Sequence, residues 1–533
     1  MSQVSNETLV TIDPQRDFKG RDLVSRLLSI ETLGSIIMVV AAVAAIIIAN
    51  TSAYEWYEGL LNFELGFRFT GFGLEDFFIG FTVEEWVNQV LMTLFFLVVG
   101  MEIKYELFVG ELKDIRAAML PIIAACGGVI MPIIIYSIFN FGGEHAHGFG
   151  IPMATDIAFA IGVLTLVGNG IPRGLTVFLK TLAIADDIMA IVVIAIFYGQ
   201  SPDPFWLVMA ALVVVVLMGM NKARVYWLVP YVVFGVVLWF CVFMSGVEAT
   251  IAGVILAFTI PTKSKINPRV FGKWTIAKIL EARNRYTYGE PMLAQGEYLD
   301  RVNMIHRVSR NVEPPLSRLE RKLSPFSNYF ILPVFAFFNA GVHLAGVDIT
   351  SVVTNTVTLG VFFGLWIGKP IGITIASLIC VKSGLTPMPS HCGWRHMIGA
   401  GMLGGIGFTM SIYVANLSFP GVGAEEVTMM AKAAILSASV VSGIVGVVYL
   451  KVILAKDRKA GSLYIVEETV DDEIKDDIKV LTQISESATD TTMGEGEYLI
   501  LTNEMGQVSD EELVDAFRAA INEGDTTYTA TQE

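Results

Sequence analysis

The stretch TLAIADDIMAIVVIAIF, residues 181–197, is apolar almost throughout but carries two adjacent aspartates, Asp186 and Asp187, near its middle. An apolar run of this length can lie across the hydrocarbon core of a membrane. A charged side chain at the centre of a bilayer costs about 2.5–3.5 kcal/mol even on the scale derived from insertion experiments, so ionisable residues there usually form a functional site. The stretch therefore predicts a membrane helix with a buried acidic site.

The composition of the whole chain is that of an integral membrane protein. Its 533 residues are 54% hydrophobic and only 16% charged, against about 25% charged in an ordinary soluble domain. Apolar runs of roughly 20 residues recur along most of the chain, and each can cross about 30 Å of hydrocarbon as a helix. The ten-residue alternation typical of a transmembrane barrel is not seen. We therefore expect an all-α membrane protein.

Twelve transmembrane spans are predicted, and the long apolar run 225–260 is divided at Ser245-Gly246, which suits a tight turn. The spans cover residues 31–50, 85–108, 117–140, 150–168, 174–198, 204–220, 224–244, 247–261, 328–346, 356–380, 396–417 and 427–455. The chain is thus organised as an N-terminal segment (1–30), spans one to eight (31–261), a basic loop (262–327), spans nine to twelve (328–455) and an acidic tail (456–533).

The lysines and arginines orient these spans, because cytoplasmic loops of membrane proteins carry an excess of both. Cations precede span one, follow span two (Lys104, Lys113 and Arg116) and fill the loop 262–327, whereas the loops after spans three, five, nine and eleven carry none. Both termini are therefore predicted to be cytoplasmic. Lys432, just inside span twelve, does not fit this pattern.

Few ionisable residues fall well inside the spans: Asp156, Asp186, Asp187 and Lys369. Ion pairs that merely hold helices together are one interpretation, but a single base cannot pair three acids. An excess of carboxylates beside a water-filled cavity is what a cation or proton site requires, and hard oxygen ligands suit small cations such as Na⁺ or Li⁺.

Glycine and proline gather in spans four and eleven, in GIPMATDIAFAIG (150–162) and GAGMLGGIGFTMSI (399–412). Such clusters let a membrane helix unwind where its backbone lines a cavity, although close helix packing also uses small residues. Matching interruptions in spans 3–5 and 10–12 indicate inverted-topology repeats whose broken helices cross. Asp156 would then balance the positive N-terminal ends of the half-helices, and Lys369 the negative C-terminal ends.

Seven segments resemble motifs of the NhaA family of bacterial sodium/proton antiporters, in order over about residues 25–455. They are FFLVVGMEIKYEL (95–107), ATDIAFAIGVL (154–164), LAIADDIMAI (182–191), SGVEATIAGVI (245–255), LPVFAFFNAGV (332–342), IGKPIGI (367–373) and GGIGFTMSIYVANL (404–417). The resemblance implies a bacterial inner-membrane protein in which Asp187 is the main cation ligand, near Thr155 and Asp156. Asp186 would be the second titrating carboxylate, able to pair with Lys369.

The same resemblance implies that Glu102, Glu106 and Glu320 take part in pH activation near the cytoplasmic mouth. The sequence departs from the family at Glu248, where a histidine is common, and at Gln89, where some members carry an acid. Arg321 and Ser324 also replace histidines of some members. We therefore expect a carboxylate at position 248 to contribute to the pH response. Lys180 is interpreted as a cation that extends to the cytoplasmic surface, with a bias on the cation site as the alternative.

These residues predict an electrogenic, pH-regulated antiporter that extrudes Na⁺, and also Li⁺, in exchange for protons. Two adjacent carboxylates in a medium of low dielectric resist losing both protons, so a cation and protons compete for the same oxygens. A Na⁺-coupled symporter of an organic solute is the alternative. An intramembrane aspartyl protease, and hence an enzyme, is disfavoured because its two acids lie on different helices, typically with a GxGD motif that this chain lacks.

The remaining expectations concern partners and the ends of the chain. No cofactor and no nucleic acid is expected; the basic loop 262–327 suits anionic lipid heads of the bilayer better, and the protein is expected to form a homodimer. In the tail, residues 508–513 match a capping box with a hydrophobic staple, and Leu513, Phe517 and Ile521 share a helix face. A small appended domain and a solvated acidic tail remain alternatives.

Overall fold

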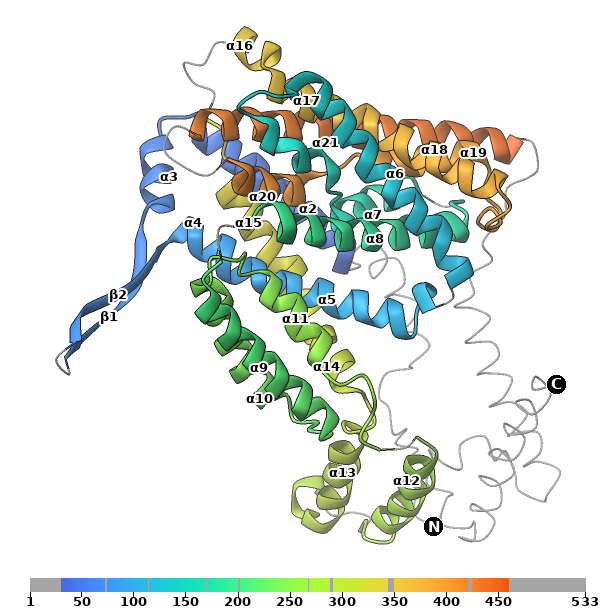
Figure 1. Cartoon of the computed structure of the whole chain (residues 1–533). Helices are drawn as coiled ribbons and strands as arrows, with labels where there is room; N and C mark the ends of the chain where they lie inside the picture. The colour runs from blue at the N-terminus through green and yellow to red at the C-terminus, as the bar shows by residue number, and fades with distance from the viewer. Residues whose placement is uncertain are drawn as a thin grey trace. The chain divides into compact units, whose positions relative to one another are not determined.

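Apolar helices account for most of the structure (Figure 1). The computed structural model describes residues 30–71, 74–113, 115–168, 170–199, 202–266, 268–287, 291–343, 349–419 and 424–459. These residues form two compact units, a larger one with residues 30–265 and 311–459 and a smaller one with residues 266–310. The predicted features of the N-terminal segment and of the tail lie outside the described residues.

The first half of the larger unit contains the elements up to residue 259. They are α2 (Ile30–Ala49), α3 (Tyr54–Leu61), β1 (Glu64–Gly71), β2 (Leu74–Thr82), α4 (Val83–Glu85), the π-helix η1 (Trp86–Leu91), α5 (Met92–Phe108), the 3₁₀ turn η2 (Glu111–Lys113), α6 (Ile115–Asn140), the 3₁₀ segment η3 (Ala146–Met153), α7 (Ile157–Thr165), α8 (Arg173–Phe197), α9 (Pro204–Lys222), α10 (Leu228–Met244) and α11 (Ile251–Thr259).

The second half of the larger unit begins at α14, and the smaller unit lies between the two halves in sequence. The second half consists of α14 (Pro315–Phe326), the π-helix η5 (Ser327–Ile331), α15 (Leu332–Asn339), α16 (Ile349–Thr354), α17 (Thr356–Phe363), the π-helix η6 (Gly364–Gly368), α18 (Lys369–Lys382), α19 (Trp394–Gly404), α20 (Phe408–Ser418) and α21 (Glu425–Lys459). The smaller unit consists of α12 (Pro268–Arg283), the 3₁₀ turn η4 (Met292–Ala294) and α13 (Gly296–Ser309).

Six continuous helices of the described chain are long and apolar enough to cross a membrane, and two bent helix pairs raise the number of candidate spans to eight. Each of the twelve predicted segments contains a helix, but several are shorter than expected. Span eight is helical only over α11, and span nine ends as a helix at Asn339. The basic loop 262–327 is itself largely helical, since it holds α12, α13 and α14.

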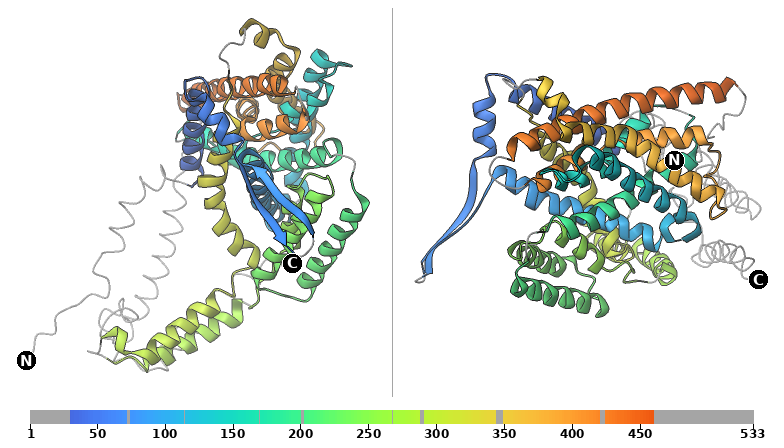
Figure 2. Two further views of the ribbon diagram at one scale, coloured as in Figure 1. Left: turned by 90° about the vertical axis from the view of Figure 1, so that its left-hand side faces the viewer. Right: turned by 45° about the horizontal axis from the view of Figure 1, so that its top comes forward.

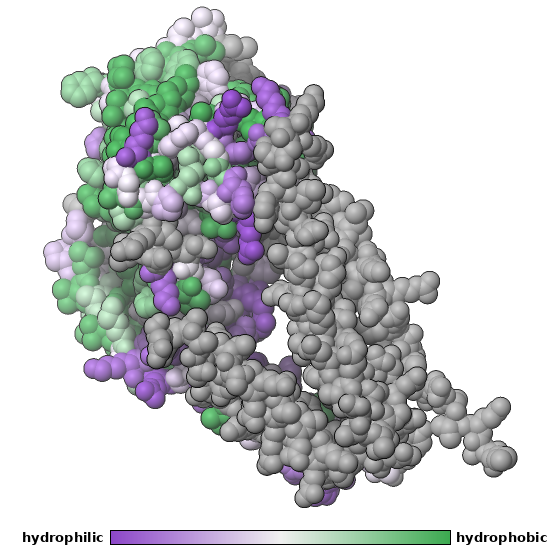
Figure 3. All heavy atoms as spheres, turned by 90° about the vertical axis from the view of Figure 1, so that its right-hand side faces the viewer, coloured by the Kyte–Doolittle hydropathy of each residue, from purple (hydrophilic) through white to green (hydrophobic). Residues whose placement is uncertain are grey.

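The outer surface of the larger unit is apolar, as the environment of lipid tails requires. On α9 and α10, side chains such as Val208, Val215 and Val236 are 59–68% exposed. Figure 3 shows hydrophobic side chains gathered over wide areas of this unit. A soluble protein rarely exposes contiguous apolar surface of this kind, so the surface supports a membrane location independently of helix length.

Two antiparallel strands form a small hairpin beside the helices of this otherwise all-helical fold. Strands β1 and β2 pair from Glu64 opposite Thr82 to Gly71 opposite Leu74, with an irregularity between Phe69 and Gly71. They lie in the predicted loop between spans one and two and project from the helices as a hairpin (Figure 2). Trp86 at the start of η1 holds its base, because the indole Nε1 donates to the Leu65 carbonyl at 2.8 Å.

Glycines let two helices cross at close range in the interior. A Cβ atom at Gly127 of α6 would overlap the carbonyl of Gly372 of α18, and the converse holds for Gly372. The two backbones are therefore in direct contact, as is common where small residues face one another in membrane helices. This crossing places the start of α18, and with it Lys369, against the middle of the bundle.

Lys104 was expected among the loop cations that follow span two, but it lies within α5 and is only 4% exposed. Its ammonium donates to the carbonyls of Phe258 at 2.8 Å and Ile260 at 2.5 Å, and more weakly to Ala257 at 3.4 Å. These carbonyls lie at the C-terminal end of α11, where the last carbonyls lack donors within the helix and the helix dipole favours a cation; that of Ala257 also accepts from the Ile260 N–H at 3.3 Å. Lys104 thus fixes the end of a helix of only nine residues.

We expect the substitution Lys104→Met to destabilise the protein by about 1.5–3 kcal/mol, because methionine fills the same space but leaves the α11 carbonyls buried without donors. The measurement is the thermal unfolding temperature in detergent. Lys113→Met, at an exposed cation, is the matched control and should leave that temperature unchanged. Equal unfolding temperatures for both variants would show that Lys104 does not hold α11.

Candidate functional site

Two predicted spans are interrupted, and their interruptions meet. In span four the chain is extended over residues 154–156, between η3 and α7. In span eleven, residues 405–407 separate α19 from α20, and the two helices are bent by 48°. The backbone N–H of Asp156 donates to the Ile406 carbonyl at 2.8 Å. The broken segments are therefore joined directly at their unwound residues, as the crossing of spans four and eleven requires.

The carboxylate of Asp156 sits at the N-terminal ends of two half-helices. As the N-cap of α7 it accepts from the Phe159 backbone N–H at 3.0 Å. Its other oxygen accepts from the backbone N–H of Thr409, at the start of α20, at 3.2 Å, and from the Thr409 hydroxyl. Helix N-termini are partly positive and leave N–H groups unpaired, so one buried carboxylate satisfies both helices.

Lys369 lies at the opposite ends of the broken helices. It begins α18 directly after the π-helix η6, and its side chain is 1% exposed. The ammonium donates to the Thr155 hydroxyl at 2.8 Å, and that hydroxyl donates to the carbonyl of Gly404, the last residue of α19, at 2.9 Å. The lysine charge thus reaches the negative end of α19 through Thr155.

The second partner of Lys369 is Asp186 of α8, whose Oδ2 lies 2.5 Å from the lysine Nζ. Asp186 and Asp187 are 2% and 1% exposed. The Oδ1 atom of each carboxylate is buried and has no hydrogen-bond partner among the described residues. A buried polar atom without a partner is unfavourable by about 1–3 kcal/mol, so such a pair of oxygens is chemically suited to accept a proton or a cation.

The structure therefore brings together five residues that the sequence singles out: Thr155, Asp156, Asp186, Asp187 and Lys369. The aspartates differ in their hydrogen bonds. Asp156 accepts from three donors, whereas Oδ1 of Asp187 accepts from none among the described residues. Among the described residues, no three His, Cys, Asp or Glu side chains gather as they would around a metal ion. The arrangement is thus a carboxylate pair, not a multidentate centre.

Thr409 is the residue of this site that the sequence analysis did not single out. Its backbone and side chain both donate to Asp156 across 253 positions of the chain. The signal was present, because Thr409 directly follows the glycine-rich break in the segment GGIGFTMSI. A hydroxyl residue in the first turn of a half-helix is suited to donate to a buried acid there.

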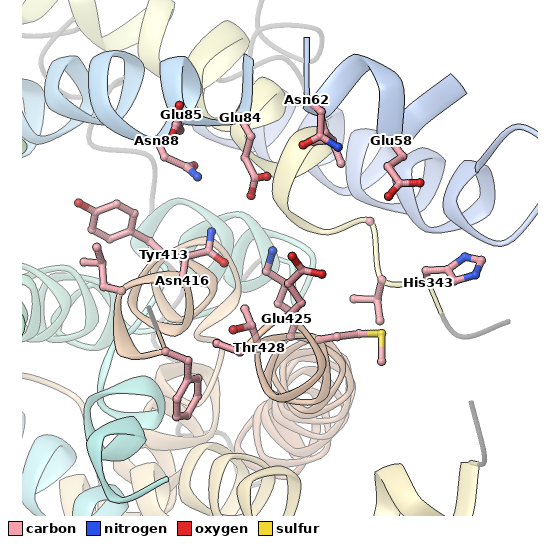
Figure 4. A pocket seen from close by; sticks show the side chains of 18 of the residues that line it. Glu58, Asn62, Glu84, Glu85, Asn88, His343, Tyr413, Asn416, Glu425 and Thr428 are labelled. Atoms are coloured by element: carbon pink, nitrogen blue, oxygen red, sulfur yellow. The ribbon is translucent and has the colours of Figure 1, made fainter. Parts of the chain in front are cut away.

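Glu248 lies apart from the aspartate pair. It precedes α11, and its Oε1 accepts from the Tyr413 hydroxyl of α20 at 2.6 Å, while Thr250 lies 3.0 Å from the same hydroxyl. Glu248 and Tyr413 line a cavity of about 680 Å³. Figure 4 shows Glu84 and Asn88 on one side of this hollow, facing Tyr413, Asn416 and Glu425 on the other.

The other three acids proposed for the pH response lie on α5 and α14. Glu102 and Glu106 are half-buried and one turn apart on α5, and Glu320 is half-buried on α14. Burial raises the pKa of Glu320; the charge of Lys180 on α8 opposes that rise, and the charge of Glu106 adds to it. Lys180 is exposed, in agreement with its interpretation as a surface cation, but its charge acts on this acidic group.

Comparison with known proteins identifies the family. Residues 25–450 match the model of the family described as Na⁺/H⁺ antiporter 1. The chain is 44% identical over 432 residues to the Na⁺/H⁺ antiporter NhaA of Helicobacter pylori strain J99, an alignment that covers 81% of this chain and 94% of the relative. It is 44% identical over 425 residues to NhaA of Wolinella succinogenes, with 79% and 91% covered.

A second NhaA relative, NhaA 2 of Helicobacter hepaticus, is 42% identical over 437 residues, with 80% of this chain and 95% of the relative covered. The solved structure of the sodium proton antiporter MjNhaP1 from Methanocaldococcus jannaschii is more distant, with 13% identity, a TM-score of 0.41 and coverage of 84% and 99%. The sequence relatives decide the assignment. The chain belongs to the NhaA family of Na⁺/H⁺ antiporters, which are multi-pass membrane transporters and not enzymes.

Proposed function

We propose that the protein exports Na⁺, and also Li⁺, in exchange for protons that compete for the carboxylates of Asp186 and Asp187. One observation carries the proposal: both carboxylates keep a buried oxygen without a hydrogen-bond partner, while Lys369 neutralises only the other oxygen of Asp186. Either a proton or a small cation relieves that deficit. Because both ligands use the same atoms, binding one displaces the other.

The choice of Asp187 as the main cation ligand follows from the contacts of its neighbours. Asp156 is occupied by the N–H groups of two helices, and Asp186 is held by Lys369. Asp187 has neither kind of partner on Oδ1. Hard cations prefer carboxylate, hydroxyl and carbonyl oxygens, and the Thr155 hydroxyl lies beside the same ammonium that contacts Asp186.

Antiport is favoured over Na⁺-coupled symport of an organic solute by the position of the cavity. The hollow of about 680 Å³ is large enough for a small solute, but neither Asp186 nor Asp187 lines it. A symporter needs its solute site to be coupled to the cation site through contact or a shared helix movement. The aspartate pair instead lies buried among packed helices, with Asp186 and Asp187 only 2% and 1% exposed.

The proposed architecture is twelve spans with both termini in the cytoplasm, and spans 3–5 and 10–12 as inverted repeats. The support is the pair of matching interruptions, which meet at Asp156 and Ile406, and the lysine and arginine bias of the loops. Alternating access then comes from movement of one helix bundle against another around this crossing. The unpaired edges of the β1–β2 hairpin support a homodimer, since a two-stranded hairpin is marginally stable alone.

The first test is the substitution Asp187→Asn, which should reduce Na⁺-driven proton release to the background of vesicles without the protein. The amide keeps the size of the side chain but removes the charge that binds Na⁺ and the site that binds a proton. The measurement is the fluorescence change of a proton probe in everted membrane vesicles on addition of Na⁺ or Li⁺. The amount of protein in the membrane should stay unchanged.

Asp203→Asn is the matched control for this experiment. Asp203 is an exposed aspartate that caps α9 by accepting from the Phe205 N–H at 2.9 Å, and asparagine is an equally good N-cap. This variant should exchange at the normal rate. Normal exchange by the Asp187 variant as well would remove Asp187 from the site, and uptake of a solute in step with Na⁺ would favour the symporter.

We propose further that exchange moves net charge, because Lys369 and Asp186 form a buried ion pair beside the proposed cation ligand. The double variant Asp186→Asn with Lys369→Gln removes both charges together, so it should retain exchange but lose its dependence on an imposed membrane potential. The single variant Asp186→Asn leaves a buried lysine without a counter-charge, which should destabilise the protein by about 3–5 kcal/mol. If exchange by the double variant followed the potential as in the unaltered protein, the pair would have no part in charge movement.

The pH response is proposed to depend on Glu320, with Glu102, Glu106 and Glu248 as further contributors. If loss of the Glu320 proton activates transport, two substitutions should shift the activity profile in opposite directions. Lys180→Gln removes the charge that holds the pKa of Glu320 down, so half-activation should move to higher pH. Glu106→Gln removes a charge that raises the pKa of Glu320, so half-activation should move to lower pH.

The measurement for these variants is the initial rate of Na⁺-dependent proton movement as a function of pH. Glu320→Gln provides the control, because Lys180→Gln should no longer shift the profile once residue 320 does not titrate. Shifts of the same sign for both variants, or a Lys180→Gln shift that persists without Glu320, would show that another group controls activation.

A further inference from the structure

The smaller unit carries a positive charge that the transport mechanism does not use. Residues 266–310 contain eight lysines and arginines against four acids. Helices α12 and α13 pack against each other as a helical pair. A hollow of about 750 Å³ lies along α13 and is bordered by side chains of that helix, by Arg285 after α12 and by Arg310 after α13. Four arginines line it, Arg285, Arg301, Arg307 and Arg310, together with His306.

Acids of the same unit pair with some of these arginines. Arg285 pairs with Glu297 at 2.6 Å, and Arg301 pairs with Glu281 at 3.0 Å. Among the described residues that line the hollow, two are acids, Glu297 and Asp300, and four are arginines. Exposed ion pairs of this kind contribute only about 0–1 kcal/mol, so a stronger acidic ligand can exchange with them. The hollow is thus suited to a flexible, acidic chain.

The chain itself contains such a ligand. The tail, residues 460–533, has nineteen acids and only three bases, and it follows directly on α21, which ends at Lys459. The family model ends at residue 450, so the tail is an addition of this protein to the shared transporter. A polypeptide extends by at most about 3.3–3.6 Å per residue, so the 74 residues of the tail are enough to reach a loop that the proposed topology places on the same membrane face.

We propose that the acidic tail, residues 460–533, binds the arginine-lined hollow of the α12–α13 pair. The proposal rests on the cytoplasmic placement of both segments in the proposed topology. Guanidinium groups bind carboxylates through two parallel hydrogen bonds, and the covalent link gives the tail an effective concentration in the millimolar range. Exposed apolar side chains beside the arginines, Val302 and Met304, suit the apolar face that Leu513, Phe517 and Ile521 would form on a helix.

The tail fits the hollow better than a lipid surface does. A flat anionic bilayer would meet Glu297 and Asp300 at the same time as the arginines, and like charges would oppose that contact. A polypeptide segment can place single carboxylates between those acids.

The test uses the full-length protein with a protease site inserted after Ala460, cut after purification in detergent without added lipid. The severed tail should remain with the transporter on size-exclusion chromatography at about 0.05 M salt. It should separate at about 1 M salt, where the Debye length is only about 3 Å. The double variant Arg307→Glu with Arg310→Glu should release the tail at low salt, with at least a tenfold loss of the bound fraction.

Lys382→Glu with Arg395→Glu is the matched control, since both are exposed cations of another predicted cytoplasmic loop; it should retain the tail. A charge reversal tests direct pairing between the tail and the arginines. When the Arg307/Arg310 variant also carries lysine at positions 510, 511 and 512, it should bind the tail again. Separation of the unaltered tail at low salt, or equal retention by both charge variants, would overturn the proposal. A third outcome would assign the hollow to the membrane instead. In that case no form of the protein would retain the tail, and the Arg307/Arg310 variant would lose only its binding to vesicles of anionic phospholipid. None of these readouts measures transport, so their failure leaves the antiport proposal intact.

Discussion

The contact between two unwound segments, Asp156 and Ile406, is the constraint on which the rest of the site depends. A membrane helix can be interrupted only if the freed backbone groups find partners inside the protein. The N–H of Asp156 and the carbonyl of Ile406 satisfy each other, and the carboxylate of Asp156 then satisfies the N–H groups at the start of α7 and α20. Neither interruption would be stable without the other, which explains why the two breaks occur together.

This constraint also determines how the buried charges are divided. One end of each broken helix is partly positive and the other partly negative, so the crossing needs an acid on one side and a base on the other. Asp156 and Lys369 occupy those places, and Lys369 reaches Gly404 through Thr155. Because Lys369 also contacts Asp186, any change in the charge of Asp186 changes the balance at the crossing. The proposed proton site and the crossing are thus linked by one ammonium group.

The sequence predicted the membrane class, the broken spans and the members of the site, but not every position. The break in span four was expected within residues 150–162 and lies at residues 154–156, directly after a 3₁₀ segment that accommodates Pro152. The hairpin was missed although Leu65, Phe67 and Phe69 alternate with Gly66, Arg68 and Thr70, a pattern typical of a strand. Local signals of this kind were available in the sequence and were not used.

Other features had no local signal at all. Lys104 resembles a loop cation in sequence, and its burial depends on carbonyls more than 150 positions away. The pairing of Lys369 with Asp186 joins residues 183 positions apart, and only the family resemblance anticipated it. Long-range pairs of this type cannot be derived from periodicity, because a period describes one helix and not its neighbours.

The difference between Asp156 and Asp187 shows why burial alone does not make a transport site. Both carboxylates are almost completely buried, yet Asp156 receives donors from two helix ends and needs no further ligand. A cation bound there would have to displace N–H groups that cannot find other partners, which is unfavourable for each group by about 1–3 kcal/mol. At Asp187 a cation or proton instead supplies a partner for an oxygen that has none. An acid can exchange ligands during transport only where the protein leaves its oxygens unsatisfied, and the adjacent aspartates of α8 meet that condition whereas the aspartate at the crossing does not.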